Sequence, residues 1–329
     1  MKTLNYFLKL TFLFGLITMM TTACKNDENV IAPDKPQPDG EALAQSHADF
    51  LEEAIQSFAV DIEEGGTVEG EQGTMLTFYA NSLVDADGND VTGEVDVELI
   101  EVFDRASMLL SDKPTQGRQE DGSIATLISG GEFFINATQN GEQLQMRPGM
   151  NMMLVAPTDT LDQGMQLFVN EDQDCLEPDC DVVWEEDRQG EMDAGNGPDG
   201  NMSYYAFPGN FGWTNIDRWY SDPRPKTTIY VDVPEWYDNT NCEVYITYDG
   251  EPTALARFDV YDPGTELFTE HYGLIPIGLE VHFIIVSIVD GQYNYAIQGA
   301  TIEDNHVEVM GDLNPTTEAE LIQMIEDLP

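Results

Sequence analysis

Basic residues are the scarcest charged class in this chain. Its 329 residues include 13 Lys and Arg against 62 Asp and Glu, which gives a formal net charge of −49 at pH 7. Binding to nucleic acid requires a basic face that neutralises phosphates, so we expect no nucleic-acid partner. Anionic lipid head groups would also repel this chain. Attachment to a membrane therefore needs something other than surface charge.

The motifs of several common chemistries are also missing. The sequence has no Gly-x-Ser-x-Gly elbow, no His-Glu-x-x-His, no Cys-x-x-Cys and no phosphate-binding glycine loop. Its four histidines lack the spacing of a zinc site. Two carboxylates could serve a glycan hydrolase, but 62 acidic residues make any such pair weak evidence. We predict a protein that is not an enzyme, with a carboxylate-dependent glycan hydrolase as the alternative.

The first residues predict a lipid anchor. A basic start precedes a mostly apolar run over residues 7–20, and the small residues 21–23 lead into Cys24. This pattern is typical of a secretory signal peptide, here residues 1–23, and the run is too short for a permanent membrane span. The small residues followed by Cys resemble a bacterial lipobox, which implies cleavage before Cys24 and its acylation. A signal cut elsewhere, leaving a free thiol, is the alternative.

Residues 24–45 predict a flexible tether, because prolines are frequent and hydrophobic residues are few. The acidic residues just after Cys24 resemble the surface-export signal of Bacteroidota lipoproteins. That resemblance implies a lipid-anchored protein of the cell outer membrane that faces the outside. An ordinary polar tether facing the periplasm is the alternative.

The rest of the chain predicts an all-β fold. Short alternating runs separated by Gly, Pro and Asn indicate two β-sandwich domains in tandem, Ig-like or ZU5-like, with a short C-terminal helix. We place the domains at residues 46–170 and 204–329, with an acidic connector at 171–203. The hydrophobic fraction of 41% is sufficient for packed cores.

Four local patterns make sharper predictions. Residues 46–58 have apolar side chains at helical spacing. Asn140-Gly141 predicts a hairpin turn. Residues 281–289 are apolar on both faces, which indicates a central strand. Residues 317–327 begin with a capping-box pattern and predict the terminal helix.

Three cysteines follow Cys24, and an exported protein can form disulfides. We predict a Cys175–Cys180 disulfide with Cys242 buried and free. Pairing of Cys242 with one of the other two is the alternative, because spacing does not fix connectivity.

Aspartates flank the predicted disulfide and are candidate calcium ligands, since calcium prefers oxygen donors and a small ring would hold the carboxylates close together. The alternative is a solvated acidic loop. The four candidates are Asp172, Asp174, Asp179 and Asp181.

Tryptophans cluster at the start of the second predicted domain. Trp213, Trp219 and Trp236 are candidates for stacking on sugar rings, and packing in a core or between domains is the alternative. We expect Asp217 and Arg218, within the same cluster, to form an ion pair.

Several segments carry a family resemblance. They are residues 73–78 (GTMLTF), 87–95 (DGNDVTGEV), 129–133 (SGGEF), 165–168 (MQLF) and 211–218 (FGWTNIDR), together with Trp184. The chain resembles a family of Bacteroidota envelope lipoproteins, and its first domain is similar to the ZU5-like β-sandwich. The resemblance implies a fold and a location but no reaction.

These observations predict a non-enzymatic, lipid-anchored envelope protein that serves as a binding or structural module. Its expected contacts are the membrane, through the lipid, and another envelope protein or a glycan. A glycan-binding accessory protein of a nutrient-uptake system is a further alternative beside the hydrolase.

Overall fold

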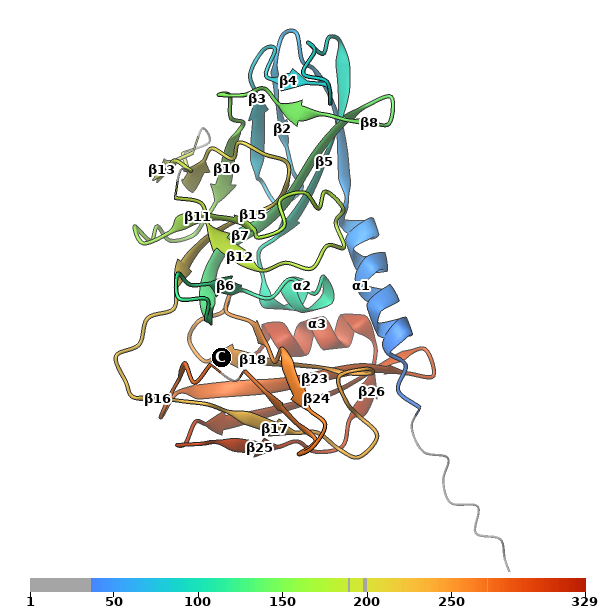
Figure 1. Cartoon of the computed structure of the whole chain (residues 1–329), viewed down its shortest axis with the longest axis vertical. Helices are drawn as coiled ribbons and strands as arrows, with labels where there is room; N and C mark the ends of the chain where they lie inside the picture. The colour runs from blue at the N-terminus through green and yellow to red at the C-terminus, as the bar shows by residue number, and fades with distance from the viewer. Residues whose placement is uncertain (1–36, 189, 198–199, 271) are drawn as a thin grey trace, which may run out of the picture. The chain divides into compact units, whose positions relative to one another are not determined.

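The computed structural model describes residues 37–188, 190–197, 200–270 and 272–329, which form several β-sheets and three helices (Figure 1). The predicted all-β class with a short C-terminal helix is confirmed. Cys24 and most of the predicted tether lie outside the described residues. Within them, every helix is too short or too polar to span a membrane.

Two sheets form the first sandwich. The larger has eight strands in the order β1-β5-β7-β15-β11-β12-β6, with β8 beside β7, and the smaller has the order β13-β14-β10-β3-β2. Their inner faces share an apolar core that includes Leu76, Leu99, Phe133, Ile135 and Leu154. The strands are β1 (Gln56–Asp61), β2 (Gly66–Glu69), β3 (Met75–Phe78), β5 (Glu94–Val102), β6 (Gln116–Arg118), β7 (Ile124–Gln139), β8 (Glu142–Gln143), β10 (Met153–Pro157), β11 (Gln166–Asn170), β12 (Trp184–Glu186), β13 (Met192–Asn196), β14 (Met202–Ala206) and β15 (Gly212–Trp219).

The second sandwich is built from a five-stranded sheet, β19-β18-β23-β24-β26, and a four-stranded sheet, β20-β21-β17-β25. Val231, Ile246, Phe268, Phe283 and Ile285 belong to the core between them. Two small ribbons, β4 with β9 and β16 with β22, complete the sheets. The remaining strands are β4 (Leu83–Val84), β9 (Gln145–Met146), β16 (Lys226–Thr227), β17 (Tyr230–Asp232), β18 (Glu243–Tyr248), β19 (Ala256–Arg257), β20 (Val260–Asp262), β21 (Leu267–Thr269), β22 (Ile275–Pro276), β23 (Glu280–Val289), β24 (Gln292–Thr301), β25 (Val307–Val309) and β26 (Asn314–Thr316).

Three of the four local predictions are confirmed. Asn140 and Gly141 adopt φ angles of 54° and 80°, as a tight hairpin turn between β7 and β8 requires. Strand β23 pairs with β18 on one side and β24 on the other, so it is central. Helix α3 (Glu318–Glu326) begins with a complete capping box formed by Thr317 and Glu320.

The fourth prediction is corrected, because helix α1 spans Gly40–Ala54 rather than 46–58. The Asp39 side chain caps the helix by accepting the N–H of Ala42 at 3.0 Å, so the last residues of the predicted tether are helical. The following residues pair with β5 as strand β1. Gly40 permits a close approach, since a Cβ atom there would lie 1.9 Å from the carbonyl oxygen of Thr240.

The sheets also differ from the predicted domain ranges. Strands β12 and β13 lie inside residues 171–203, which we expected to be an acidic connector. Strand β14 crosses the predicted boundary at residue 203 and β15 lies beyond it, yet they pair with β10 and β7 of the first sandwich. Strands of three to five residues give little alternation to detect, and the acidic composition of this segment conceals them.

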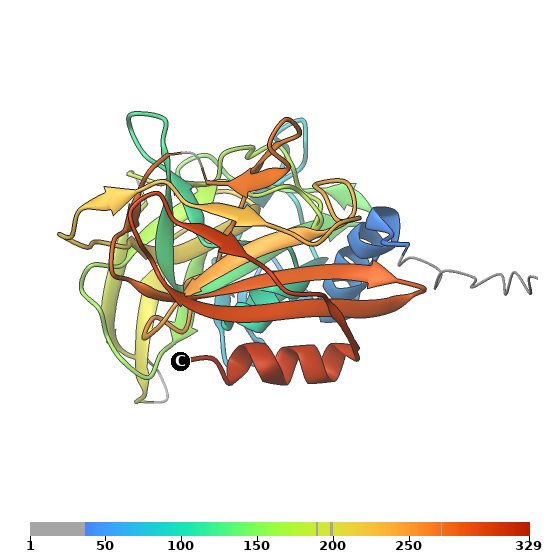
Figure 2. The same cartoon turned by 90° about the horizontal axis from the view of Figure 1, so that it is seen from below.

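A third apolar core lies between the sandwiches. It combines α1, α2 (Arg105–Leu110) and α3 with residues of the eight-stranded sheet and of the five-stranded sheet that contains β23. Its members include Leu109, Phe134, Trp184, Ile284 and Leu321. Figure 2 shows α3 lying along the sheet that contains β23 and β24. Because both sandwiches contribute buried side chains to this helical layer, their separation would expose apolar surface to water.

Charged and polar side chains also connect the two sandwiches at this helical layer, which we call the joint. Glu243 accepts hydrogen bonds from His47 of α1 at 3.0 Å and from the Tyr245 hydroxyl at 2.6 Å. The Tyr245 hydroxyl also lies 2.9 Å from Asp112, and Arg257 contacts Asp112 at 2.7 Å and Glu243 at 3.4 Å. This group of five residues, the joint network, connects α1 and the end of α2 to β18 and β19.

The joint network makes stability depend on pH through His47. Burial alone would lower the pKa of His47, but its hydrogen bond with Glu243 and the charges of Glu243 and Asp112 raise the pKa above its usual value. The stabilising contribution is therefore complete below the unfolded-state pKa of about 6.5 and disappears as the pH rises through the folded-state pKa. We expect His47→Gln to remove this loss of stability, measured by urea unfolding from about pH 5.5 to 8.5. A variant whose stability falls as steeply as that of the wild type would contradict this role.

Candidate functional site

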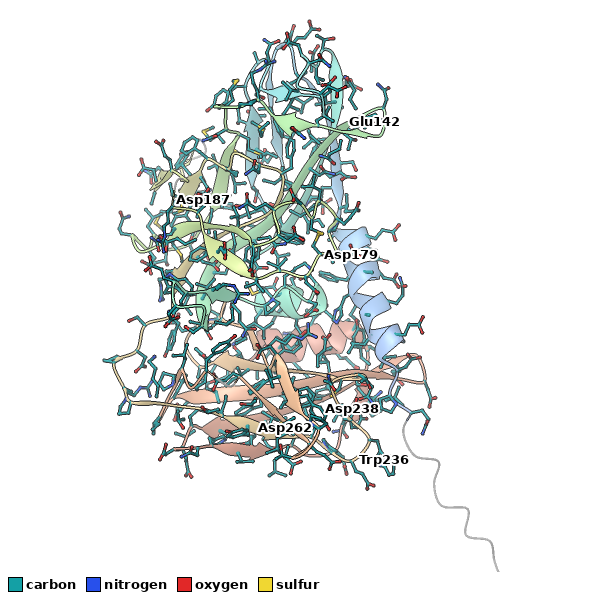
Figure 3. The ribbon with its side chains drawn as sticks, viewed as in Figure 1. Glu142, Asp179, Asp187, Trp236, Asp238 and Asp262 are labelled. Carbon is teal, nitrogen blue, oxygen red and sulfur yellow. A yellow bond between two sulfur atoms is a disulfide. The ribbon has the colours of Figure 1, made fainter. Side chains whose placement is uncertain are left out.

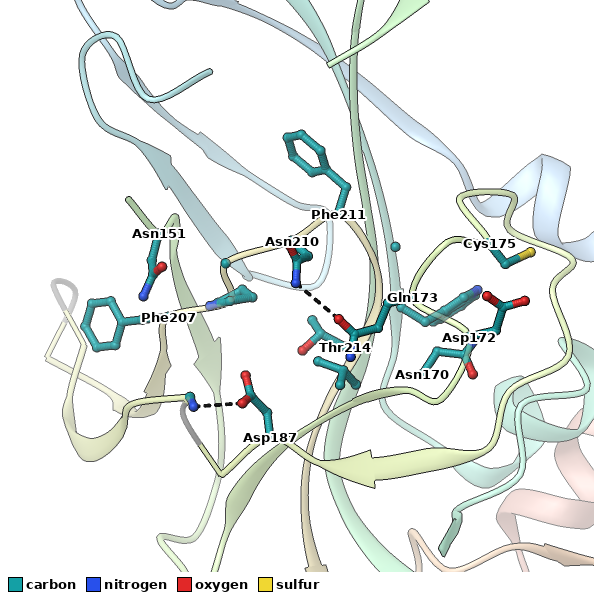
Figure 4. Close-up of a pocket in the computed structure, with 16 residues that line it drawn as sticks. Asn151, Asn170, Asp172, Gln173, Cys175, Asp187, Phe207, Asn210, Phe211 and Thr214 are labelled. Atoms are coloured by element: carbon teal, nitrogen blue, oxygen red, sulfur yellow. Dashed lines mark hydrogen bonds between the residues drawn. The ribbon is translucent and has the colours of Figure 1, made fainter. Parts of the chain in front are cut away.

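A pocket of about 400 Å³ opens beside the disulfide loop (Figure 4). The lining comes from the end of β11 and the loop after it, from two residues after β12, from the segment leading into β15, and from one residue before β10. These are Val169, Asn170, Asp172, Gln173, Cys175, Asp187, Gly190, residues 207–214 and Asn151. We refer to these residues together as the disulfide-rimmed pocket. It therefore draws on both sheets of the first sandwich and on the loops between them.

The disulfide holds one wall of this pocket. Cys175 and Cys180 are bonded, with their Cα atoms 6.2 Å apart, and Cys242 is buried and free. Both cysteine predictions are confirmed. Cys175 itself lines the pocket, so the crosslink restrains the segment that carries Asp172 and Gln173.

Removing this crosslink is expected to weaken the fold and the pocket wall. A short closed loop of this kind contributes about 2 kcal/mol by restricting the unfolded chain. We expect the double variant Cys175→Ser, Cys180→Ser to lose about that much free energy of unfolding, measured by urea titration. Reductant added to the wild type is the control and should reproduce the loss. Equal free energies of unfolding for the oxidised and the reduced protein would contradict a stabilising role of the disulfide.

Side-chain amides dominate the open part of the pocket. Asn151 and Asn210 are exposed at its mouth, as is Gln173, and the Asn210 amide donates to Gln173 Oε1 at 3.3 Å. Buried Asn170 and Thr214 instead donate to backbone carbonyls. Asn151, Gln173 and Asn210 are therefore the polar side chains that can exchange hydrogen bonds with a ligand, and each amide both donates and accepts.

The charge of the pocket is negative. Asp172 and Asp187 contribute carboxylates, and no Lys, Arg or His occurs among the described residues of its lining. Each carboxylate also accepts a nearby backbone N–H, from Asp174 at 3.2 Å and from Gly190 at 2.9 Å. Phe207 adds an aromatic side chain close to Asn151 (Figure 4). Anionic ligands are disfavoured, because nothing in this lining would neutralise them.

The four candidate calcium ligands are not gathered into one site. Asp172, Asp174, Asp179 and Asp181 are all exposed. The described ranges contain no group of three or more His, Cys, Asp or Glu side chains that could hold a metal ion. The disulfide closes the loop but leaves the carboxylates in water, where separation relieves their repulsion.

The three candidate tryptophans do not form a platform for stacking. Trp213 is buried, packs on Phe134 with ring centroids 5.6 Å apart, and donates its indole N–H to a backbone carbonyl at 2.9 Å. Trp219 lies edge-on to Phe168 at 5.4 Å. Trp236 is 41% exposed and lies in the second sandwich, near Asp238 (Figure 3). Core packing therefore accounts for Trp213 and Trp219, as the alternative interpretation held.

The expected ion pair between Asp217 and Arg218 is wrong. Arg218 instead contacts Asp162 at 2.7 Å and Glu251 at 3.3 Å, because neighbouring residues in a strand point in opposite directions. Asp217 turns inward and lies with Glu132, fully buried. One signal for this pair is visible in the sequence, because each acidic residue lies in a predominantly apolar or aromatic segment.

Comparison with known proteins adds no relative. No protein-family model matches the chain, and no curated protein matches it.

Proposed function

We propose that this chain is a non-enzymatic binding module of a bacterial cell envelope, with the disulfide-rimmed pocket as its binding site. A lipid on Cys24 holds it at the outer membrane, facing outward, as the lipobox and the adjoining acidic residues indicate. The similarity of several segments to envelope lipoproteins supports the same location.

The ligand class that fits the pocket is a small, neutral, polyhydroxylated molecule such as a sugar residue. The observation that supports this choice is the set of three open amides, Asn151, Gln173 and Asn210, in a lining without a described cation. Neighbouring hydroxyl groups need partners that both donate and accept, as amides do. Phe207 offers an apolar surface for the C–H face of a ring.

Two observations favour binding over glycan hydrolysis. The carboxylates in the pocket, Asp172 and Asp187, each accept a backbone N–H group, which suits a structural role in their own loops. Burial raises the pKa of Glu132 and of Asp217 well above the usual values, but both residues are fully buried and absent from this lining. A general acid must reach the glycosidic oxygen.

Titration calorimetry with neutral, acidic and amino oligosaccharides tests the ligand class. We expect neutral sugars to bind, and Asn210→Ala or Gln173→Ala to weaken binding about tenfold, the effect of one lost hydrogen bond. Asn314→Ala, an exposed site on β26, is the matched control and should bind like the wild type. Preference for acidic sugars, or equal losses in all three variants, would refute the site.

The anchor is tested separately by mass spectrometry of the protein isolated from membranes. We expect the mature chain to begin at Cys24 with acyl groups attached. A chain that begins elsewhere and carries no lipid would refute the location without bearing on the pocket.

A further inference from the structure

Two acidic residues lie side by side inside the joint between the sandwiches. Glu132 pairs with Asn215 across β7 and β15, and Ser129 pairs with Asp217, with a bulge in the register between them. Gly131 permits that bulge with a φ of 133°. Both Glu132 and Asp217 are 0% exposed. We refer to these two residues as the acid pair.

One amide bridges the acid pair. Asn215 Nδ2 donates to Glu132 Oε1 at 3.3 Å and to Asp217 Oδ2 at 2.8 Å. Ser129 Oγ donates to Asn215 Oδ1, the side-chain oxygen, at 3.0 Å, which fixes the orientation of that amide. The other two oxygens, Glu132 Oε2 and Asp217 Oδ1, are buried and accept no hydrogen bond from any described residue. Oxygens of ionised carboxylates are rarely left this way.

The charges around the acid pair do not balance. Lys113 is the cation that faces it, and its ammonium is also buried, 5.4 Å from the centre of the Trp213 ring. The charges of Asp112, Asp181 and Asp179 also act on Lys113. Two ionised carboxylates beside one ammonium would leave a net negative charge in a dry interior, which is strongly unfavourable.

We propose that Glu132 and Asp217 hold one proton between them at neutral pH, with Lys113 balancing the remaining carboxylate, and that losing this proton weakens the joint. The proton removes the excess charge, and a neutral carboxyl oxygen costs less to bury without a partner than an ionised one. The same segments contact the second sandwich, because Thr253 Oγ1 donates to the Ser129 carbonyl at 2.7 Å and Thr115 N–H donates to the Leu255 carbonyl at 2.8 Å.

The sign of the pH effect follows from the direction of the pKa shifts. Burial raises the pKa of Glu132 well above its usual value, and the charge of Asp217 adds to this, while Lys113 opposes it. Burial also raises the pKa of Asp217 well above its usual value, and the nearby Ser129 hydroxyl offsets only part of the rise. A carboxyl with a raised folded-state pKa binds its proton more tightly in the folded chain. Its contribution is complete below the unfolded-state pKa and is lost as the pH rises.

Thermal unfolding of the full mature chain from about pH 5 to pH 10 tests the proposal. We expect the melting temperature of the wild type to fall toward alkaline pH, and Glu132→Gln to raise it by several degrees at pH 8 and flatten its pH dependence. The stabilising contribution of His47 also disappears with rising pH, so His47→Gln is made as a second background. The effect of Glu132→Gln on the melting temperature should be the same in the His47→Gln variant as in the wild type. Glu142→Gln, in the exposed hairpin turn, is the matched control and should follow the wild type.

Infrared spectroscopy detects a protonated carboxyl group directly. We expect the wild type at pH 7 to show the carbonyl stretch of a protonated carboxyl that Asp217→Asn or Glu132→Gln diminishes. If neither variant folds, the wild-type spectrum still decides, because absence of any protonated-carboxyl band at pH 7 overturns the proposal. A melting temperature at pH 8 that rises with added calcium and falls with chelator, in the wild type but not in Asp217→Asn, would also overturn it by placing a metal ion at the orphaned oxygens.

Discussion

Replacing Trp184 with alanine is expected to lower the free energy of unfolding by about 3–5 kcal/mol, the range for deleting a large buried aromatic side chain. Trp184 is 0% exposed and belongs to the core between the sandwiches. Its indole N–H donates to the Pro114 carbonyl at 3.1 Å, and its strand joins β11 to β6. Truncation would therefore leave a cavity and an unpaired carbonyl in the joint. Urea unfolding followed by circular dichroism measures the loss.

Trp236→Ala is the matched control for this experiment. The same atoms are removed from a side chain that is 41% exposed, and we expect a change within about 0.5 kcal/mol. Equal losses from the two tryptophans would mean that the segment around β12 is not part of the packed joint.

The second large effect is expected at Glu243. At pH 7, Glu243→Ala should destabilise the fold by about 3–5 kcal/mol, because it leaves His47 buried without its carboxylate and removes one of the two acidic partners of half-buried Arg257. Burial raises the pKa of Glu243, but its hydrogen bond with His47 and the charges of His47 and Arg257 lower the pKa to about 2. The carboxylate therefore contributes fully above the unfolded-state pKa of about 4.3, and the loss caused by the variant should shrink as the pH falls below it.

Glu280→Ala provides the control, because Glu280 is an exposed glutamate at the start of β23, the strand beside Glu243. We expect it to stay within about 0.5 kcal/mol of the wild type. If Glu243→Ala is no worse than this control, the joint network does not hold the sandwiches together.

Local chemistry made part of the fold predictable. A hairpin turn at Asn140 and the capping box before α3 depend on a few adjacent residues, so the sequence states them directly. The apolar run that becomes β23 is equally clear, because a strand covered on both faces has no polar alternation. These signals suffice for the class of fold.

Long-range pairing was not predictable in the same way. Nothing local shows that β15 returns to pair with β7, or that Trp184 belongs to a packed core, because the acidic residues around it dominate the pattern. The sequence placed the disulfide correctly from a five-residue spacing. The pocket beside it was missed, since Asn151 and Asn210 come together only when separate loops meet.

Buried acids are the hardest feature to detect in a chain of this composition. Glu132 and Asp217 are two among 62 acidic residues, nearly all of which suit a solvated surface. Glu132 pairs with Asn215, and Asp217 lies two residues from Asn215, so both acids share one face of the sheet; no periodicity rule reports this long-range pairing or the bulge beside it.

The position of α1 has a consequence for the order of assembly during synthesis. Asp39 donates its N–H to the carbonyl of Ile288, and His47 meets its partner Glu243 196 residues later in the chain. A ribosome releases α1 first, yet the surface that receives its buried Leu43 and Leu51 is complete only after the second sandwich has emerged. The first helix of the described residues is thus among the last to pack, and the emerging chain carries an uncovered apolar stripe until its distant half has been made.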